Sequence, residues 1–240
     1  MTRFLASVRD PAEAALALGA GADIIDLKYP DSGALGALEA AAIKACVTAV
    51  AGRAPVSATV GDLPMDVGRV HDAVHATAGL GVDDVKLGVL PGGDPQACFA
   101  RLGAYPADAG LILVFFADAL PRFDPVAAAL EAGARGVMLD TAGKLAGSLL
   151  DHMALGAIAR FVEAARRAGL MAGVAGSLRA SHVAPLLSLR PDVIGFRGAL
   201  CRGGVRRSNL DPIACSRIRA LIPAASQQSQ FEQPSASVVC

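Results

Sequence analysis

The sequence predicts an α/β fold, a single (β/α)₈ or TIM barrel, and three observations carry that prediction. Short apolar runs alternate with alanine-rich helical stretches eight times, as repeated βα units around a parallel sheet require. Eight units in roughly 220 residues match a compact barrel, for which about 250 residues are typical. Glycine recurs after a helix and before a strand in GAGAD, GLGVDD, EAGARG and RRAGL, as helix-ending loops require.

Each expected strand is a short apolar run, and each expected helix is the stretch that follows it. In chain order, we expect strands at residues 3–8, 23–28, 55–60, 83–88, 110–116, 136–140, 171–175 and 192–197. The helices are expected near residues 10–19, 37–50, 66–79, 94–103, 123–132, 151–168, 179–189 and 209–221. A doubly wound sheet is the alternative, but SVRDPAEA stands after the first strand where that fold would favour G-x-G-x-x-G.

Composition divides the chain into two parts. Residues 1–222 are expected to form the barrel, which is the catalytic domain. The segment 223–240 changes to glutamine, serine and proline and has little to bury, so we expect a disordered tail.

The charge balance bears on partners and location. The chain has 22 basic and 22 acidic residues, so no strong field favours nucleic acid. No apolar run approaches membrane-spanning length, and charges interrupt the N-terminal segment where a signal peptide would be apolar. We expect a soluble, cytoplasmic protein that acts on a small molecule; its oligomeric state stays open, with a homo-oligomer as one option.

Cysteine and histidine usage gives no sign of a metal site. Five cysteines without a C-x-x-C pair fit neither a disulfide framework nor a zinc ribbon. His71 and His75 are spaced i, i+4, but no acidic third ligand lies nearby and HExxH is absent. We therefore expect reduced thiols and no metal.

Charged residues occur where strands of the predicted barrel end. Because strand side chains alternate, Asp26 and Lys28 share one face while Ile25 and Leu27 face the helices. The same alternation points Lys86 and Asp140 into the mouth of the barrel at the strands' carboxyl ends, where active sites lie, and Lys144 follows on the next loop. Further polar positions on or just after the third strand are Ser57, Thr59 and Asp62.

Lysine usage sharpens this prediction. Only Lys28, Lys44, Lys86 and Lys144 are lysines, and three of these four fall at the predicted mouth. An ε-amine can lose its proton and attack a carbonyl, whereas arginine stays protonated. A second ammonium and apolar walls favour the neutral amine, while Asp26 and Asp140 oppose it, so which lysine is the nucleophile stays open. Structural ion pairs are the alternative explanation.

The loops after the last two strands predict a phosphate site. Glycine-containing loops at these two places are the recurring phosphate site of such barrels. The predicted ligands are Gly176, Ser177, Arg197, Gly198 and Ala199. Alternatively, Ser177 is a helix cap and the glycines only form turns. A basic rim of Arg202, Arg206 and Arg207 is a candidate for a second phosphate.

At these residues the chain resembles the (5-formylfuran-3-yl)methyl phosphate synthases of methanofuran biosynthesis. The resemblance covers nearly all of residues 3–221, through GADIIDLKYPDSGALGA, VSATVGDLP, VKLG, MLDTAGK, AGSLRASH and VIGFRGALCRGG. It implies a (β/α)₈ enzyme that condenses two glyceraldehyde 3-phosphate molecules into a phosphorylated furan aldehyde, with loss of phosphate and water. It implies that Lys28 forms the Schiff base and Lys86 is the general acid/base, beside Asp26, Asp140 and Lys144. No cofactor is implied.

Two other functions remain open at this stage. A lysine-dependent aldolase acting on another sugar phosphate would share the amine and the phosphate loops. A phosphate-binding barrel without catalysis would keep the loops and would not need the lysines.

Overall fold

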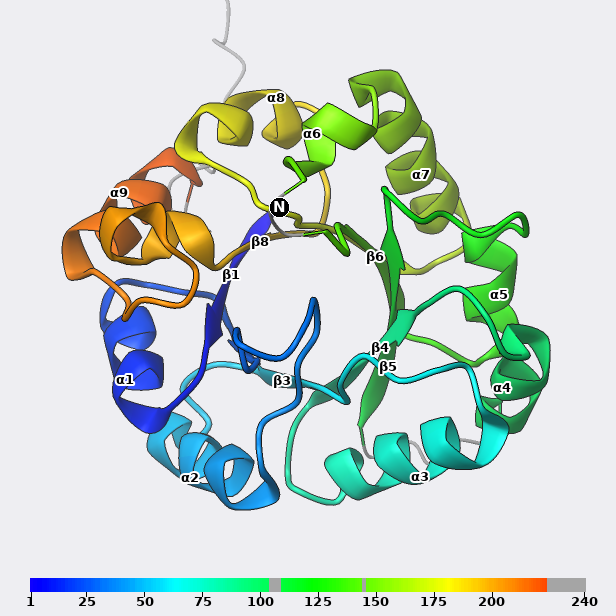
Figure 1. Ribbon diagram of the computed structural model, residues 1–240. Coiled ribbons are helices and arrows are strands. Elements are labelled where there is room, and N and C mark those ends of the chain that lie inside the picture. Colours follow the sequence, from blue (N-terminus) through cyan, green and yellow to red (C-terminus); the bar gives the residue numbers. More distant parts are fainter. Residues whose placement is uncertain (104–108, 144–145, 224–240) are drawn as a thin grey trace, which may run out of the picture.

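Eight parallel strands close into a barrel, and each strand pairs with its neighbours in chain order. The computed structural model describes residues 1–103, 109–143 and 146–223. Figure 1 shows the ring of strands surrounded by a layer of helices. The strands are β1 (Arg3–Val8), β2 (Ile24–Leu27), β3 (Val56–Thr59), β4 (Asp84–Val89), β5 (Gly110–Phe116), β6 (Gly136–Asp140), β7 (Met171–Val174) and β8 (Val193–Phe196). Pairing of β1 with β8 closes the barrel, so the predicted fold class is confirmed.

The helices of the outer layer begin where the sequence supplies caps. They are α1 (Pro11–Gly19), α2 (Ala40–Val50), α3 (Val67–Ala78), α4 (Pro95–Leu102), α5 (Pro125–Glu131), α6 (Leu149–His152), α7 (Leu155–Arg167), α8 (Val183–Leu187) and α9 (Pro212–Leu221). In α1, α4, α5 and α9 an aspartate caps the helix and the proline that follows it begins the helix. The aspartate accepts a first-turn N–H and proline lacks the N–H that would stay unpaired, so an Asp-Pro pair starts a helix efficiently.

Two expected helices differ from the prediction. The stretch expected at 151–168 is two helices, α6 and α7, because Met153 and Ala154 adopt extended backbone conformations between them. The stretch expected at 179–189 begins with a 3₁₀ turn, η1 (Ala180–His182), before α8. After β8, two further 3₁₀ turns, η2 (Gly198–Leu200) and η3 (Arg202–Gly204), precede α9. The alanine-rich composition did not reveal these interruptions because they depend on how the adjoining loops pack against the barrel.

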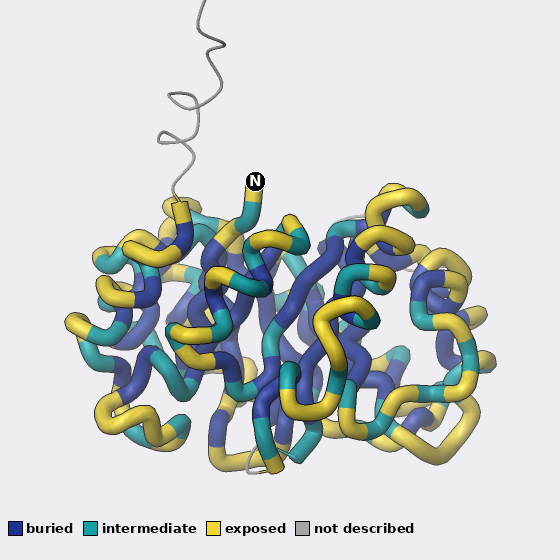
Figure 2. The backbone as a smooth tube through the Cα atoms, turned by 90° about the horizontal axis from the view of Figure 1, so that it is seen from above, coloured by how far each residue is buried: buried dark blue, intermediate teal, exposed yellow. Residues whose placement is uncertain are grey.

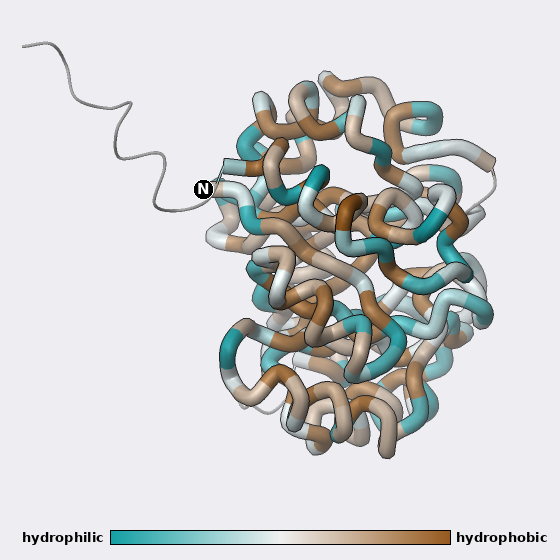
Figure 3. Tube along the Cα trace, turned by 90° about the vertical axis from the view of Figure 1, so that its left-hand side faces the viewer, coloured by the Kyte–Doolittle hydropathy of each residue, from teal (hydrophilic) through white to brown (hydrophobic). Residues whose placement is uncertain are grey.

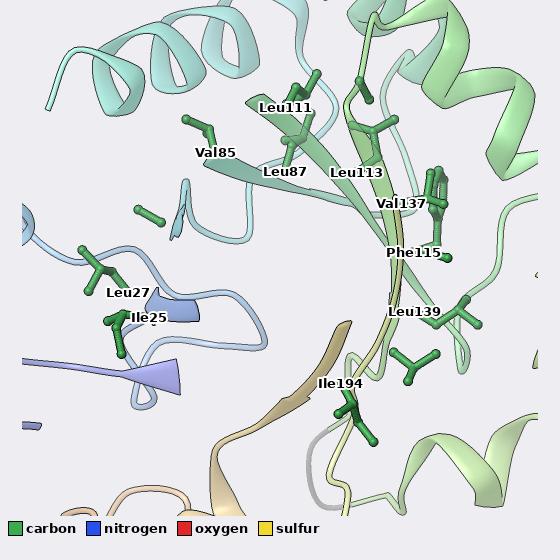
Figure 4. Packing of buried hydrophobic residues seen from close by; sticks show 14 of the residues in the cluster. Ile25, Leu27, Val85, Leu87, Leu111, Leu113, Phe115, Val137, Leu139 and Ile194 are labelled. Atoms are coloured by element: carbon green, nitrogen blue, oxygen red, sulfur yellow. The ribbon is translucent and has the colours of Figure 1, made fainter. Parts of the chain in front are cut away.

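The apolar residues form two clusters on opposite faces of the sheet. The larger one lies between the strands and the helices and includes Ile25, Leu27, Val85 and Leu87 (Figure 4). The smaller one fills the inside of the barrel with Leu5, Ile24, Ala34, Leu35, Ile112, Val114, Phe116, Met138 and Val193. Figure 2 shows the buried strands inside a shell of exposed loops and helix faces. Strand alternation therefore sends odd-numbered β2 side chains outward and leaves Asp26 facing the interior.

The helices alternate hydrophobic and hydrophilic positions along the chain (Figure 3). Their apolar side chains cover the barrel and their polar ones face water, as expected for helices packed on a sheet. Within the described ranges, no helix has both the length and the apolar character needed to cross a membrane. The expected tail falls almost wholly on residues 224–240, which lie outside the described residues.

Candidate active site

A cavity of about 700 Å³ opens at the carboxyl ends of the strands. Its walls come from the strand ends β1, β2, β4, β5 and β6, from Leu35 in the loop after β2, and from the loops after β7 and β8. In a (β/α)₈ barrel this end carries the active site. The residues predicted for catalysis and for phosphate binding line this one cavity, apart from Lys144, which lies outside the described residues.

Asp26 and Lys86 form a tight buried pair in the cavity floor. The Lys86 Nζ lies 2.8 Å from Asp26 Oδ1. The hydroxyl of Ser57, on β3, donates to the same oxygen at 2.7 Å, and the hydroxyl of Ser7, on β1, donates to Asp26 Oδ2 at 2.7 Å. Four neighbouring strands thus hold one carboxylate, and both of its oxygens are hydrogen-bonded.

The electrostatics of Asp26 follow from these contacts. Burial by itself would raise the pKa of this carboxyl, but the ammonium groups of Lys86 and Lys28 and the hydrogen bonds from Lys86 and Ser57 outweigh it, so the pKa is lowered. Both lysines therefore lie close enough to Asp26 to stabilise its charge. The carboxylate is a permanent anion at neutral pH.

Lys28 and Asp140 form a second, looser pair. The Lys28 Nζ lies 3.5 Å from Asp140 Oδ2, while Asp140 Oδ1 accepts the backbone N–H of Thr141 at 2.8 Å. Lys28 follows the last residue of β2, and its backbone N–H still donates to Val8. Asp26, Lys28, Lys86 and Asp140 are between 1% and 8% exposed, so none of these charges faces bulk water.

The other polar positions predicted on or just after β3, Thr59 and Asp62, hold a loop and do not line the cavity. Asp62 accepts the backbone N–H groups of Ala34 and Leu35, at 2.6 and 2.9 Å, and Thr59 donates to the carbonyl of Gly36 at 2.9 Å. These bonds place Leu35, which is 1% exposed, inside the barrel mouth. The segment after β2 reaches toward the barrel axis in Figure 1.

Leu35 is a wall of the site that the sequence interpretation missed. It belongs to the cluster inside the barrel although it comes from a loop. A Cβ at Gly88 would lie 2.8 Å from Leu35 Cδ1, so glycine at that position makes room for the inserted side chain. The apolar residues of the loop at 33–35, followed by Asp62 after the next strand, were the available signal for this wall. A local pattern alone, however, does not show that a loop residue enters a barrel.

The predicted phosphate loops border the cavity with Gly176, Ser177, Gly198 and Ala199. Gly176 has φ 105°, and a Cβ there would meet Thr141 at 3.0 Å, so any other residue would be strained and tightly packed at this position. Ser177 has φ 46°, a left-handed conformation that is uncommon outside glycine. The loop after β7 is thus bent sharply, with its backbone against the cavity.

Arg197 has a different surrounding from the one expected of a phosphate ligand. Its Nη1 donates to Glu13 Oε2 at 2.5 Å and to the Ser7 carbonyl at 3.1 Å. Its Nη2 donates to Glu13 Oε1 at 3.2 Å and to the Ser208 carbonyl at 3.0 Å, and its Nε to the Arg206 carbonyl at 2.9 Å. A guanidinium has five N–H donors, and all five are engaged here. A phosphate contact from Arg197 would therefore have to come from its backbone.

Glu13 is the second residue that the sequence interpretation missed. It lies in the first turn of α1 and is buried, and the same carboxylate also accepts backbone N–H groups from Arg9 and Leu210. It joins the first βα loop to the last one, 184 residues away along the chain. No sequence spacing indicates such a partner.

A closed (β/α)₈ barrel with lysines and carboxylates buried at the carboxyl ends of its strands defines a barrel enzyme. The chain belongs to the 4-HFC-P synthase family, whose family model matches residues 4–219. The protein is therefore an enzyme of the (5-formylfuran-3-yl)methyl phosphate synthase type, as the resemblance implied.

Curated relatives with this name match the chain over most of their length. A protein of Methylorubrum extorquens named "Putative (5-formylfuran-3-yl)methyl phosphate synthase" is 45% identical over 210 residues, which are 87% of this chain and 86% of the relative. The (5-formylfuran-3-yl)methyl phosphate synthase of Methanopyrus kandleri is 34% identical over 234 residues, 92% of this chain and 98% of the relative.

Solved structures share the fold at low sequence identity. Phosphoribosyl anthranilate isomerase from Thermus thermophilus gives a TM-score of 0.62 at 15% identity, covering 92% of this chain and 98% of that one. A 3-hexulose-6-phosphate synthase gives 0.56 at 20% identity, covering 92% and 100%. These likenesses support the (β/α)₈ fold.

Proposed function

We propose that the enzyme condenses two molecules of glyceraldehyde 3-phosphate into (5-formylfuran-3-yl)methyl phosphate through a Schiff base on Lys28, for methanofuran biosynthesis. The observation that carries the proposal is the pair of buried amines, Lys28 and Lys86, which line one cavity and have an aspartate each. A metal-independent attack on a carbonyl needs one such amine, and proton transfer at carbon needs a second ionisable group.

The two pairs suit different roles. Lys86 is held at 2.8 Å by a fully hydrogen-bonded carboxylate, so it keeps a fixed position. Lys28 lies 3.5 Å from Asp140 and is held less closely, which leaves its nitrogen freer to reach a carbonyl carbon. We therefore assign the nucleophile to Lys28, the proton acceptor from its ammonium to Asp140, and general acid/base catalysis to Lys86.

The reaction then follows in steps. The amine of Lys28 adds to the carbonyl of one triose phosphate and expels water, giving an iminium that acidifies the adjacent C–H. Lys86, which is hydrogen-bonded to the Asp26 carboxylate, moves protons as an enamine forms and adds to the carbonyl of the second triose. Phosphate elimination, ring closure and dehydration give the aromatic furan, and hydrolysis frees Lys28. Balance of atoms requires the net loss of one phosphate and two waters.

The phosphate of the Lys28-bound triose is proposed to lie on the backbone of the loops after β7 and β8. Gly176 and Gly198 bring the main chain to the cavity wall opposite the lysines' strands. The catalytic unit that we propose is residues 1–222, since α9 ends at Leu221 and the residues with proposed roles precede it.

The test is to trap the first covalent intermediate. Borohydride reduction in the presence of glyceraldehyde 3-phosphate should add the mass of one reduced triose phosphate to the peptide containing Lys28, and product analysis should find the furan aldehyde. Lys28→Arg, which keeps the charge, should lose both signals. An adduct of undiminished yield in Lys28→Arg would refute the assignment, and trapping with a product other than the furan would indicate an aldolase.

A further inference from the structure

The proposed condensation brings two phosphate groups into one cavity, and the β7 and β8 loops account for one of them. The second triose phosphate needs its own cationic partner. Besides Arg197, whose side-chain donors are all engaged, three arginines line the cavity, Arg179, Arg206 and Arg207. Arg202, the remaining member of the rim predicted from the sequence, is exposed and is not among the lining residues.

Arg206 differs from the other two in its surroundings. Arg207 is exposed and forms an ion pair with Asp31 at 3.1 Å, and Arg179 is exposed as well. Arg206 is half-buried, and its Nη2 donates to a neutral acceptor, the carbonyl of Gly33, at 3.1 Å. Across the described ranges no carboxylate lies within ion-pair distance of its guanidinium, so the cavity wall contains a cation that lacks a direct anionic contact.

The electrostatics around Arg206 support the same conclusion. Burial lowers its pKa because desolvation penalises the charge, and Asp140 opposes this from within the cavity. Arg207 and Arg197 add like charge nearby. A partly desolvated guanidinium of this kind is stabilised by an anion, and phosphate accepts two parallel N–H bonds from it.

The backbone of Arg206 is held in place by the ion pair at Arg197. The Arg197 Nε donates to the Arg206 carbonyl at 2.9 Å, and the Arg197 guanidinium is itself fixed by Glu13. The loop that carries Arg206 follows β8, and through Arg197 it is anchored to Ser7 on β1 and to Glu13 on α1. With its backbone fixed in this way, Arg206 extends its side chain along the cavity wall and contacts Gly33 in the loop after β2.

We propose that Arg206 binds the phosphate of the second triose phosphate, the one that is not attached to Lys28. This inference rests on the proposed function and assigns that site its second anion subsite. The first phosphate then lies on backbone amides and the second on a side chain, so the two substrate molecules have distinct orientations. Arg206 also contacts the loop that carries Leu35, which places the second triose beside this apolar wall.

The test compares Arg206→Gln and Arg206→Lys with the control Arg202→Gln. Two readouts are needed, borohydride trapping of one triose on Lys28 and the rate of furan formation against glyceraldehyde 3-phosphate concentration. Arg206→Gln should keep trapping within about twofold of wild type, while the concentration giving half-maximal furan formation rises at least about tenfold, as expected for a lost charge-assisted hydrogen bond. Arg206→Lys should recover part of that loss, and Arg202→Gln should match wild type.

Two results would overturn the subsite. An unchanged concentration dependence in Arg206→Gln shows that Arg206 binds no phosphate, and an equal fall of trapping and turnover assigns it to the first triose. Thermal unfolding of each variant identifies a misfolded protein, and Arg206→Lys keeps the test valid in that case. Failure of the proposed function is distinct, because wild type itself would then give no Lys28 adduct.

Discussion

The two lysine–aspartate pairs at the barrel mouth are alike in composition and burial but differ in their support. Lys86 and Asp26 lie 2.8 Å apart, with serines from β1 and β3 on the carboxylate. Lys28 and Asp140 lie 3.5 Å apart at the ends of β2 and β6. The first pair joins β2 and β4, which lie on either side of β3, whereas the second joins the ends of β2 and β6, on opposite sides of the barrel. The difference shows that the Lys86 amine is held more closely than the Lys28 amine, which supports the separate roles proposed for them.

The largest effect on turnover should come from replacing Lys86 while Lys28 is kept. Lys86→Arg keeps the charge beside Asp26 but cannot exchange a proton near neutral pH, so turnover should fall about 10²–10⁴-fold. The Lys28 adduct should still be trapped. Steady-state furan formation and borohydride trapping measure the two quantities, and a loss of trapping equal to that of Lys28→Arg would show that the pairs do not have separate roles.

The next effect concerns stability. Asp26→Asn leaves the buried ammonium of Lys86 without its anion, and loss of one partner of a buried pair costs about 3–5 kcal/mol. Asp140→Asn breaks a longer contact and should cost less, about 1–2 kcal/mol. Urea unfolding of both variants measures the free energies. Equal losses would contradict the difference in support that the geometry indicates.

The pH dependence sharpens the same comparison. The pKa of Asp26 is lower in the folded protein than in the unfolded chain, where it is about 3.9. The folded state therefore binds this proton less well than the unfolded chain does. The contribution of the ionised Asp26 to stability is fully present above the unfolded pKa of about 3.9 and is lost as pH falls through the folded pKa. The difference in unfolding free energy between wild type and Asp26→Asn should be constant near neutral pH and shrink only below about pH 4.

The smallest effect is expected at the serines. Ser7→Ala removes one of the two hydroxyl donors to Asp26 and should lower the unfolding free energy by about 1 kcal/mol. Ser188→Ala, an exposed hydroxyl that bonds a backbone carbonyl outside the site, is the matched control for stability and should leave turnover unchanged. A Ser7→Ala enzyme with wild-type stability would show that the hydroxyl contributes nothing to holding the carboxylate.

The chemistry-bearing residues of the floor were predictable from local pattern. Strand alternation has a period of two, so one apolar pair, Ile25 and Leu27, was enough to direct Asp26 and Lys28 inward. The same rule applied to Lys86 and Asp140. Because parallel barrel strands all end at one mouth, knowing that each residue lay near a strand end predicted that they would meet.

The outer parts of the site were not predictable in this way. Arg197 stands in the predicted phosphate loop, but its five donors are engaged by Glu13 and by backbone carbonyls, one of them from Ser7. Leu35 enters the barrel because Asp62 and Thr59 hold its loop there. The break between α6 and α7 occurs within a stretch whose composition favours one helix.

The amino-acid order thus determined the barrel, the direction of each strand side chain and the gathering of amines and carboxylates at one mouth, because these follow from short-range periodicity repeated eight times. Folding in three dimensions decided which charge neutralises which, since Glu13 and Arg197 become neighbours only when β8 pairs with β1. A hydrogen-bond donor pairs with an acceptor that the closed barrel brings close to it, and no local spacing in the sequence specifies which acceptor that is. The cavity cation at Arg206 is a consequence of that closure.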